Sequence, residues 1–283
     1  MKKLIHIRTR KLISWYDKIV EAKNDDNAKQ ILLNIKPNVK DRYDYYEANF
    51  SSNDLITITD SNYLKNHPQL LSCYKSEGEA LKKLKRKIRK LQDDKLKGVC
   101  QYCGIRKPIS FDHYLPISDY PEFGVLPINL IPCCLECNGK KKSYWKENDV
   151  RSIINFYLDN IEDRQFLFAK INFRNNIPSL KFYLRNPGNN IDSELFQTIE
   201  YHFYRLELLN LYKSESSDEL DEIIQKLKIY VKLTDNVKLK DMFTEDKVRL
   251  EIQFGINYWK AVMLNAMAKS NNFLDFMVNE INN

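Results

Sequence analysis

The sequence has few of the residues that interrupt helices. Its 283 residues include only seven glycines and nine prolines, while 29% are charged and 43% are hydrophobic. This balance favours a helix-rich globular protein of one large or two small domains over a disordered chain or a many-stranded sandwich. A glycine-rich phosphate-binding loop, a dinucleotide-binding fingerprint and internal repeats are also lacking. Any nucleotide-driven control would therefore have to come from another subunit.

Long apolar runs are missing as well. No stretch approaches the roughly 20 apolar residues that a membrane-spanning helix needs. Lysines and arginines interrupt residues 1–18 before a signal-like core can form. We therefore expect a cytoplasmic protein.

Acidic residues are scarce in one part of the chain. The net charge is +7, and residues 78–146 hold 15 Lys and Arg against 7 Asp and Glu, a local excess of +8. All other residues together therefore carry about −1. A basic segment of this kind favours a polyanionic partner such as nucleic acid.

Four of the six cysteines form two close pairs, Cys100/Cys103 and Cys134/Cys137. Each pair leaves two residues between its thiols, the spacing that lets one turn of backbone present two sulfurs to a tetrahedral Zn²⁺. The pattern favours metal binding in a reducing compartment over a disulfide framework. Because all four ligands are thiolates, the predicted zinc is structural and has no open position for substrate.

The other two cysteines are Cys73 and Cys133. Cys133 could replace its neighbour Cys134 as a ligand, but only Cys134 keeps the two-residue spacing to Cys137. Cys73 and Cys133 are therefore expected to be buried free thiols.

Helical periodicity predicts helices over most of the remaining chain. One helix is expected over residues 1–35, ending before Pro37, and a second over residues 150–161. Two alternating segments, 166–173 and 180–184, predict a β-hairpin. Three further helices are expected over residues 191–212, 217–233 and 245–268, with Asp192 and Thr244 as N-caps.

Residues 77–95 predict a basic amphipathic helix. Its apolar residues fall on one face, and seven Lys and Arg crowd positions 82–90. Such runs commonly face solvent, but like charges at i,i+4 repel by roughly 0.2–0.5 kcal/mol per pair. We therefore favour a helix that binds phosphates, with Arg86, Arg89 and Lys90 as candidate contacts.

The segment between the cysteine pairs carries polar residues suited to hydrolysis. Thirty residues separate Cys103 from Cys134, more than the ~15–20 of a plain zinc ribbon. This insert contains Asp112-His113 in a predicted strand over 111–116, and Asn129 in an apolar segment over 125–131. Asn138 directly follows the second cysteine pair, in a helix expected over 134–142.

This arrangement, Cys-x-x-Cys, Asp-His, Asn-Leu and Cys-x-x-Cys-Asn-x-Lys, resembles the HNH endonuclease family. The resemblance implies a β-hairpin followed by a helix around a divalent ion, the ββα-metal fold, beside a four-cysteine zinc site. It implies His113 as general base, Asn129 as a brace, and Asp112 with Asn138 as ligands of the catalytic ion. Asn138 stands where many members have His, as in the HNH domains of RNA-guided nucleases.

The chemistry of these residues agrees with the resemblance. A neutral imidazole with a pKa near 6.5 can take a proton from water at cellular pH. Carboxylate and amide oxygens are hard ligands, which suit Mg²⁺ or Mn²⁺. The basic residues nearest the motif are candidate phosphate contacts, and they are Lys140, Lys141, Lys142, Arg106 and Lys107.

We therefore expect a mainly α protein with a small ββα-metal nuclease module and a minor β-hairpin. Its expected regions are a helical segment over 1–95, the nuclease module over 96–147 and a mostly helical segment over 148–283. The expected function is hydrolysis of DNA phosphodiesters with one catalytic metal ion. Because one such site cuts one strand, double-strand cleavage would require a homodimer or a partner.

Stand-alone HNH proteins with helical flanks resemble nucleases of bacterial anti-phage defence systems. This resemblance implies an ATPase or another defence-system subunit as a partner. Two alternatives stay open at the level of sequence. One is a non-catalytic zinc module that binds nucleic acid or protein, and the other is an RNase, since phosphate chemistry alone does not read the sugar.

Overall fold

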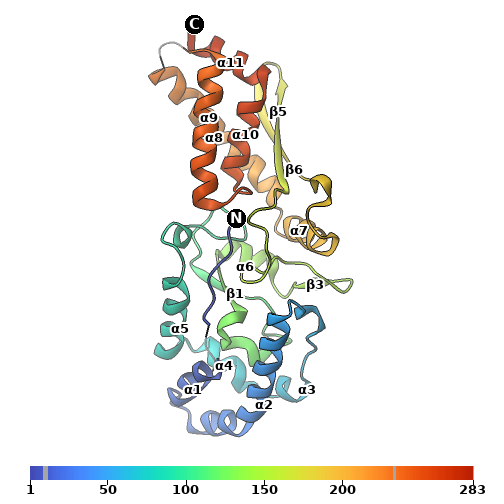
Figure 1. Ribbon diagram of the computed structural model, residues 1–283. Helices are drawn as coiled ribbons and strands as arrows, with labels where there is room; N and C mark the ends of the chain where they lie inside the picture. Colours follow the sequence, from blue (N-terminus) through green and yellow to red (C-terminus); the bar gives the residue numbers. More distant parts are fainter. Residues whose placement is uncertain (9–11, 232–233, 283) are drawn as a thin grey trace. The chain divides into compact units, whose positions relative to one another are not determined.

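The computed structural model describes residues 1–8, 12–231 and 234–282. The described chain is mostly helical and has small two-stranded antiparallel sheets (Figure 1). The prediction of a mainly α protein with a minor β-hairpin is confirmed. In the described residues, no helix is both long enough and apolar enough to cross a membrane.

The chain forms two compact units. The N-terminal unit comprises residues 3–159, and the C-terminal unit comprises residues 160–283 together with residues 1–2. The predicted regions 1–95 and 96–147 lie within the N-terminal unit, apart from the first two residues. All residues of the predicted nuclease site belong to this unit.

The first helices of the N-terminal unit differ from the prediction. Residues 1–8 are not helical, and two separate helices follow, α1 (Ile13–Glu21) and α2 (Asp26–Ser51). Asp25 begins α2 as its N-cap, because its carboxylate accepts a hydrogen bond from the Ala28 N–H at 2.9 Å. Residues 9–11 of the predicted helix lie outside the described residues.

The predicted end before Pro37 is wrong, because Pro37 lies inside α2. An interior proline costs a helix about 3 kcal/mol or more. The apolar stripe of α2 continues on both sides of it, however, with Leu32, Ile35, Val39 and Tyr43 all buried. Burial of this stripe outweighs the lost hydrogen bond.

Three further helices, two of them short, complete this part of the unit: α3 (Asn62–Lys65), α4 (Gln69–Lys75) and α5 (Glu79–Lys90). Helix α5 is the predicted basic helix. Its apolar residues Leu81, Leu84 and Ile88 are buried, so its cations occupy the remaining faces.

The predicted ββα arrangement is present. Strand β1 (Ser110–His113) pairs antiparallel with β2 (Leu130–Cys133), and the register places Asp112 opposite Ile131 and His113 opposite Leu130. Helix α6 (Leu135–Lys141) follows β2 directly. Both strands are short and almost wholly buried, so the hairpin holds the adjacent loops in place from inside the unit.

The prediction of a helix over residues 150–161 is wrong. Val150–Arg151 is a short strand, β4, paired with β3 (Lys146–Glu147), and turns follow it. The Asp159 carboxylate accepts from the Arg151 guanidinium at 2.7 Å and from the Asn155 N–H at 2.7 Å. These bonds fold the segment back on itself, because a buried carboxylate must be satisfied by nearby donors.

The C-terminal unit contains the predicted hairpin. Strands β5 (Leu167–Arg174) and β6 (Ile177–Leu184) pair in register. The two-residue turn between them, Asn175 and Asn176, has positive φ angles of 50° and 61°. Asparagine tolerates this conformation, which matches the twist of the flanking strands.

The helices of this unit have other bounds than the three predicted, and residues 232–233 of the predicted second helix lie outside the described residues. They are α7 (Ser193–Arg205), α8 (Leu208–Tyr230), α9 (Asn236–Phe254), α10 (Trp259–Lys269) and α11 (Asn271–Asn282). Helix α10 packs beside strand β5 and helix α9 (Figure 1). Breaks occur where the backbone adopts positive φ, at Glu207 with 55° and at Gly255 with 89°.

One of the two predicted helix caps is confirmed. The Asp192 carboxylate accepts from the backbone N–H groups of Glu194 and Leu195. Thr244 is not a cap, because it lies inside α9 and its hydroxyl donates to the Lys240 carbonyl at 2.7 Å. Asp235 caps α9 instead.

Candidate metal centre and active site

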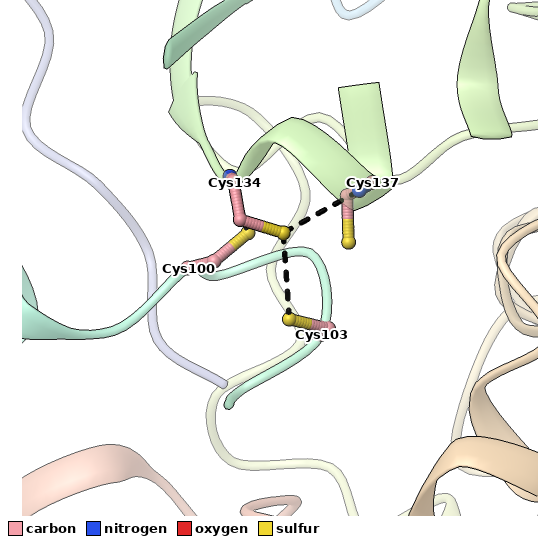
Figure 2. Close-up of side chains that lie close together, drawn as sticks. All are labelled: Cys100, Cys103, Cys134 and Cys137. Atoms are coloured by element: carbon pink, nitrogen blue, oxygen red, sulfur yellow. Dashed lines mark hydrogen bonds between the residues drawn. The ribbon is translucent and has the colours of Figure 1, made fainter. Parts of the chain in front are cut away.

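The four paired cysteines converge on one point of the N-terminal unit. Cys100 and Cys103 lie in the loop before β1, Cys134 is the N-cap of α6, and Cys137 lies in the first turn of that helix. The four sulfur atoms all lie within 4.8 Å of one another, and all four residues are buried. Figure 2 shows the four side chains gathered around a common centre.

This cluster could hold a metal ion such as zinc. Zn–S bonds of about 2.3 Å place tetrahedral sulfurs about 3.8 Å apart, close to the 4.0 Å between the sulfurs of Cys103 and Cys134. The neighbouring sulfurs raise the pKa of the Cys137 thiol and lower that of Cys134. Adjacent thiols thus do not all ionise together by themselves. A divalent cation would remove that repulsion, so the donor set fits a thiophilic ion.

Cys73 and Cys133 are buried free thiols, as predicted. The Cys133 sulfur lies 3.4 Å from the Ser110 hydroxyl oxygen across the β1–β2 hairpin. Burial raises the pKa of the Cys73 thiol to about 11, so this thiol is not poised to ionise.

Three of the predicted catalytic residues line one cavity. Asp112, His113 and Asn138 contribute to the wall of a hollow of about 240 Å³, together with residues 116–118, 142 and 143. β1 supplies the first two and α6 the third. Asn138 follows His113 by 25 positions in the sequence. The folding of β1, β2 and α6 into a single motif brings the two residues to the same cavity.

The His113 imidazole is held in one orientation. Its Nε2 atom lies 2.9 Å from the Gly124 carbonyl oxygen, and a carbonyl can only accept, so Nε2 carries the proton. The lone pair of the neutral ring is therefore on Nδ1. The ring also packs edge-on against Tyr74, with 4.2 Å between ring centroids.

Burial keeps this imidazole uncharged. The pKa of His113 falls to about 3, chiefly through loss of hydration, with Lys141 and Lys85 lowering it further and the Gly124 hydrogen bond opposing them. Sequence reasoning missed both Gly124 and Tyr74. No motif marks them, since Tyr74 lies on α4 and Gly124 in a short helical turn between the strands.

The Asp112 carboxylate is already engaged by two donors. Lys141 donates to Oδ1 at 3.0 Å, and the Tyr102 hydroxyl donates to Oδ2 at 2.8 Å. Burial raises the pKa of this carboxyl, while Lys141 and Tyr102 act in the opposite direction. Each oxygen retains a further lone pair that could reach a cation from the cavity.

The position of Lys141 corrects the prediction that it contacts phosphate. Its side chain has no exposed surface. Besides Asp112, its ammonium donates to the carbonyls of His113 at 2.8 Å and of Tyr114 at 3.2 Å. A signal for this burial was present in the sequence, because Lys141 lies four residues after Cys137 and thus on the same face of α6.

Asn129 links several parts of the loop between β1 and β2. It is completely buried. Its oxygen accepts from the Leu115 N–H at 2.8 Å and from the Tyr46 hydroxyl at 3.2 Å. Its amide nitrogen donates to the carbonyls of Leu115 at 3.0 Å and Phe123 at 3.2 Å. The Asn129 side chain thus ties residues 115 and 123 together, within the loop whose Gly124 carbonyl contacts the His113 ring.

Asn138 can offer an oxygen to a cation. Its amide nitrogen donates to the Phe111 carbonyl at 3.3 Å, so the amide oxygen is left to accept another partner. With Asp112, the cavity wall holds two hard oxygen donors that fit Mg²⁺ or Mn²⁺. The Lys141 ammonium is a competing positive charge, which lowers the affinity of the Asp112 carboxylate for such an ion.

The remaining cationic candidates differ in their surroundings. Lys142 is exposed and lines the cavity. Arg106 and Lys140 both contact Glu136, at 3.7 Å and 3.2 Å, and Lys107 is exposed.

On α5, Lys90 is exposed, and Arg86 is exposed with a contact of 3.4 Å to Glu79. Arg89 is half-buried and donates to the Ile109 carbonyl at 2.8 Å. Arg89 therefore supports the turn before β1 as well as contributing charge.

The chain has a relative in a bacteriophage. It is 32% identical to Protein ea31 of Escherichia phage lambda over 188 residues, which is 62% of this chain and 62% of the phage protein. The chain thus spans less than two thirds of that relative's length. No protein-family model matches this chain, and no solved structure matches it. The likeness to HNH nucleases therefore depends on the motif residues and on the ββα geometry.

Proposed function

We propose that this protein is an HNH-type DNA endonuclease that depends on a divalent ion and uses His113 as its general base. The observation that carries the proposal is the shared cavity of His113, Asp112 and Asn138. One proton acceptor and two hard oxygen ligands around one volume are the groups that metal-assisted hydrolysis of a phosphodiester requires.

His113 supplies the proton acceptor. Because Gly124 holds the Nε2–H, Nδ1 takes the proton of a water molecule as its oxygen attacks the phosphorus. The bond from phosphorus to O3′ then breaks and O3′ takes a proton from solvent water, which leaves a 5′-phosphate and a 3′-hydroxyl. Tyr74 fixes the ring from its edge, and Asn129 fixes the loop that carries Gly124.

The remaining polar groups serve binding. Asp112 and Asn138 are the residues that would hold Mg²⁺ or Mn²⁺, and the bound ion would supply positive charge to the phosphate oxygens. Lys142 at the same cavity is placed to contact a phosphate. The four cysteines would hold a structural Zn²⁺ that stabilises the small hairpin.

The proposal has a decisive test in a cleavage assay. Purified protein is incubated with supercoiled plasmid and with a structured RNA, each with and without added Mg²⁺. We expect Mg²⁺-dependent nicking of the plasmid, and loss of nicking in the H113A variant at unchanged zinc content. The variant also controls for contaminating nucleases.

Each alternative predicts a different result. A non-catalytic zinc module leaves both substrates intact in Mg²⁺, and an RNase cuts the RNA while sparing the plasmid. Nicking of the plasmid at the same rate by H113A and the parent would remove the proposed mechanism. Dimerisation, an ATPase partner and a role in anti-phage defence stay predictions.

A further inference from the structure

A second, larger cavity adjoins the candidate active site in the N-terminal unit. It measures about 490 Å³ and lies between α5 and the start of the ββα motif. Asn138 lines both this cavity and the smaller one that contains His113 and Asp112. The two hollows therefore meet at a residue of the proposed catalytic site. We refer to the larger one as the α5 cavity.

One face of α5 makes the α5 cavity cationic. Lys82, Lys85, Arg86 and Arg89 line it. Helical geometry places these residues on one face, while Lys83, Lys87 and Lys90 lie on another face about 100° away. The seven basic residues of this helix are thus divided into two groups, and only one of them faces the cavity.

Acidic neighbours do not cancel this charge. Glu77 also lines the cavity and lies 2.8 Å from the Lys85 ammonium. Glu79 contacts Lys82 at 3.5 Å and Arg86 at 3.4 Å. Two carboxylates against four cations leave a positive cavity, and the exposed ion pairs contribute little that an incoming phosphate could not replace.

The other side of the α5 cavity is apolar. Ile109 and Leu135 line it although their side chains remain 64% and 63% exposed. Phe111 lies deeper, with the Arg89 guanidinium 4.6 Å from its ring centroid. Large exposed aliphatic side chains beside four cations suit a ligand that combines an anionic group with a flat apolar surface.

An unpaired nucleotide has this combination. Its phosphate is anionic, and the faces of its base are free to pack against apolar side chains. In a duplex the base faces are stacked on one another, so only the backbone could use such a cavity. The mixture of cations and exposed aliphatic side chains therefore favours single-stranded over double-stranded nucleic acid.

We propose that the α5 cavity binds an unpaired segment of the DNA strand next to the phosphate that is cleaved. This inference rests on the proposed nuclease function and names its substrate class, which is DNA with a single-stranded stretch. The strand passes Asn138 from one cavity to the other. Its phosphates contact the cationic face of α5, and its bases pack on Ile109 and Leu135.

The test compares two double variants with equal loss of charge. K82A/R86A removes two exposed cations of the cavity face, and K83A/K87A removes two exposed cations of the other face. Binding of fluorescent oligodeoxythymidine and of a blunt DNA duplex is measured over a range of salt concentrations, without added Mg²⁺. Zinc content and far-UV circular dichroism establish that both variants are folded.

We expect the parent to bind the single strand more tightly than the duplex. In K82A/R86A, the slope of log K against log salt for the single strand should fall by about 1.4, since each lost phosphate contact contributes about 0.7. K83A/K87A should retain the parental slope. Equal effects of the two double variants, or tighter binding of the duplex by the parent, would overturn the proposal.

The apolar wall has its own variant. L135S removes an exposed aliphatic side chain without a change in charge. We expect it to weaken binding of the single strand about 5-fold, as the loss of about 40 Å² of buried apolar contact does, and to leave binding of the duplex unchanged. An unchanged affinity for the single strand would contradict a role of this wall in base packing.

These binding measurements separate the two proposals. If the protein binds single strands through α5 but cuts nothing in Mg²⁺, the nuclease proposal fails and the cavity proposal stands as a binding site. If it nicks plasmid with equal efficiency in all these variants, the nuclease function stands and the assignment of the α5 cavity fails.

Discussion

Lys141 and Asp112 form an ion pair inside the ββα motif, with 3.0 Å between Nζ and Oδ1 and only 0% and 2% of their side chains exposed. The pair joins the end of α6 to the strand that carries His113. Because the same ammonium also bonds to the His113 carbonyl, helix and strand are fixed relative to one another. The geometry of the candidate site depends on this contact.

Loss of the Lys141 ammonium should destabilise the protein strongly. In K141M the Asp112 carboxylate stays buried without its cation, and removal of one partner from a buried pair costs about 3–5 kcal/mol of unfolding free energy. Urea denaturation followed by circular dichroism measures the change. The exposed neighbour gives the matched control, and K142M should alter the free energy of unfolding by less than about 0.5 kcal/mol. Equal midpoints for both variants would show that the pair adds nothing.

Zinc binding should depend on the paired cysteines and not on their neighbour. The parent is expected to carry one zinc per chain, and C137S should lose most of it and melt at a lower temperature, because bound metal contributes directly to folding. C133A is the control, since Cys133 is buried but lies outside the four-sulfur cluster. Metal content by mass spectrometry decides the matter. Full zinc occupancy in C137S would speak against the four-thiolate site.

Substitution of Asn129 should lower stability, whereas substitution of Asn138 should slow cleavage. N129A leaves the Leu115 N–H and two carbonyls without their partner, and each unsatisfied buried group costs about 1–3 kcal/mol. A loss of at least 2 kcal/mol, measured in urea, is therefore expected. N138A, at a half-buried position with one weak hydrogen bond, should stay within about 1 kcal/mol of the parent yet nick plasmid far more slowly. Parental nicking by N138A would argue against its role as a metal ligand.

The rate of nicking should depend on the basic nitrogen of His113 more than on the hydrogen bond that its side chain donates to Gly124. H113Q can still donate an amide proton to the Gly124 carbonyl, because its side-chain amide lies near the position of the imidazole Nε2, but it has no proton acceptor of comparable basicity, so nicking should slow by about 10²–10⁴-fold. Y74F keeps the edge-on ring contact of 4.2 Å and should nick at nearly the parental rate. Initial rates in Mg²⁺ at matched zinc content measure both. A slow Y74F with a fast H113Q would reverse the assigned roles.

Local patterns were reliable where the chemistry is local. The two-residue spacing of the cysteines predicted a four-sulfur cluster, and all four sulfurs lie together. The alternation around Arg174 predicted the β5–β6 hairpin, which is present. The motif also placed Asp112, His113 and Asn138 at one site, and they line one cavity.

Local patterns failed where distant contacts outweigh local propensity. Pro37 was expected to end a helix, but a continuous buried stripe carries α2 through it. Residues 150–161 were expected to be helical, but the ion pair of Arg151 with Asp159 folds them into a strand and turns. Propensity is worth tenths of a kcal/mol for an ordinary residue and about 3 kcal/mol for an interior proline. Burial of each large apolar side chain contributes about 1.5–3 kcal/mol, and a buried charge left without its partner costs about 3–5 kcal/mol.

The sequence by itself determined which side chains could hold a thiophilic ion and which could act on a phosphate, because ligand spacing and residue chemistry are properties of short segments. Only the tertiary structure decided how those groups are tuned. It buried the Lys141 side chain against Asp112, brought the Gly124 carbonyl to His113, and turned one face of α5 toward Asn138. Such contacts join residues far apart in the chain, and the packing of whole elements, which no short segment encodes, brings them together.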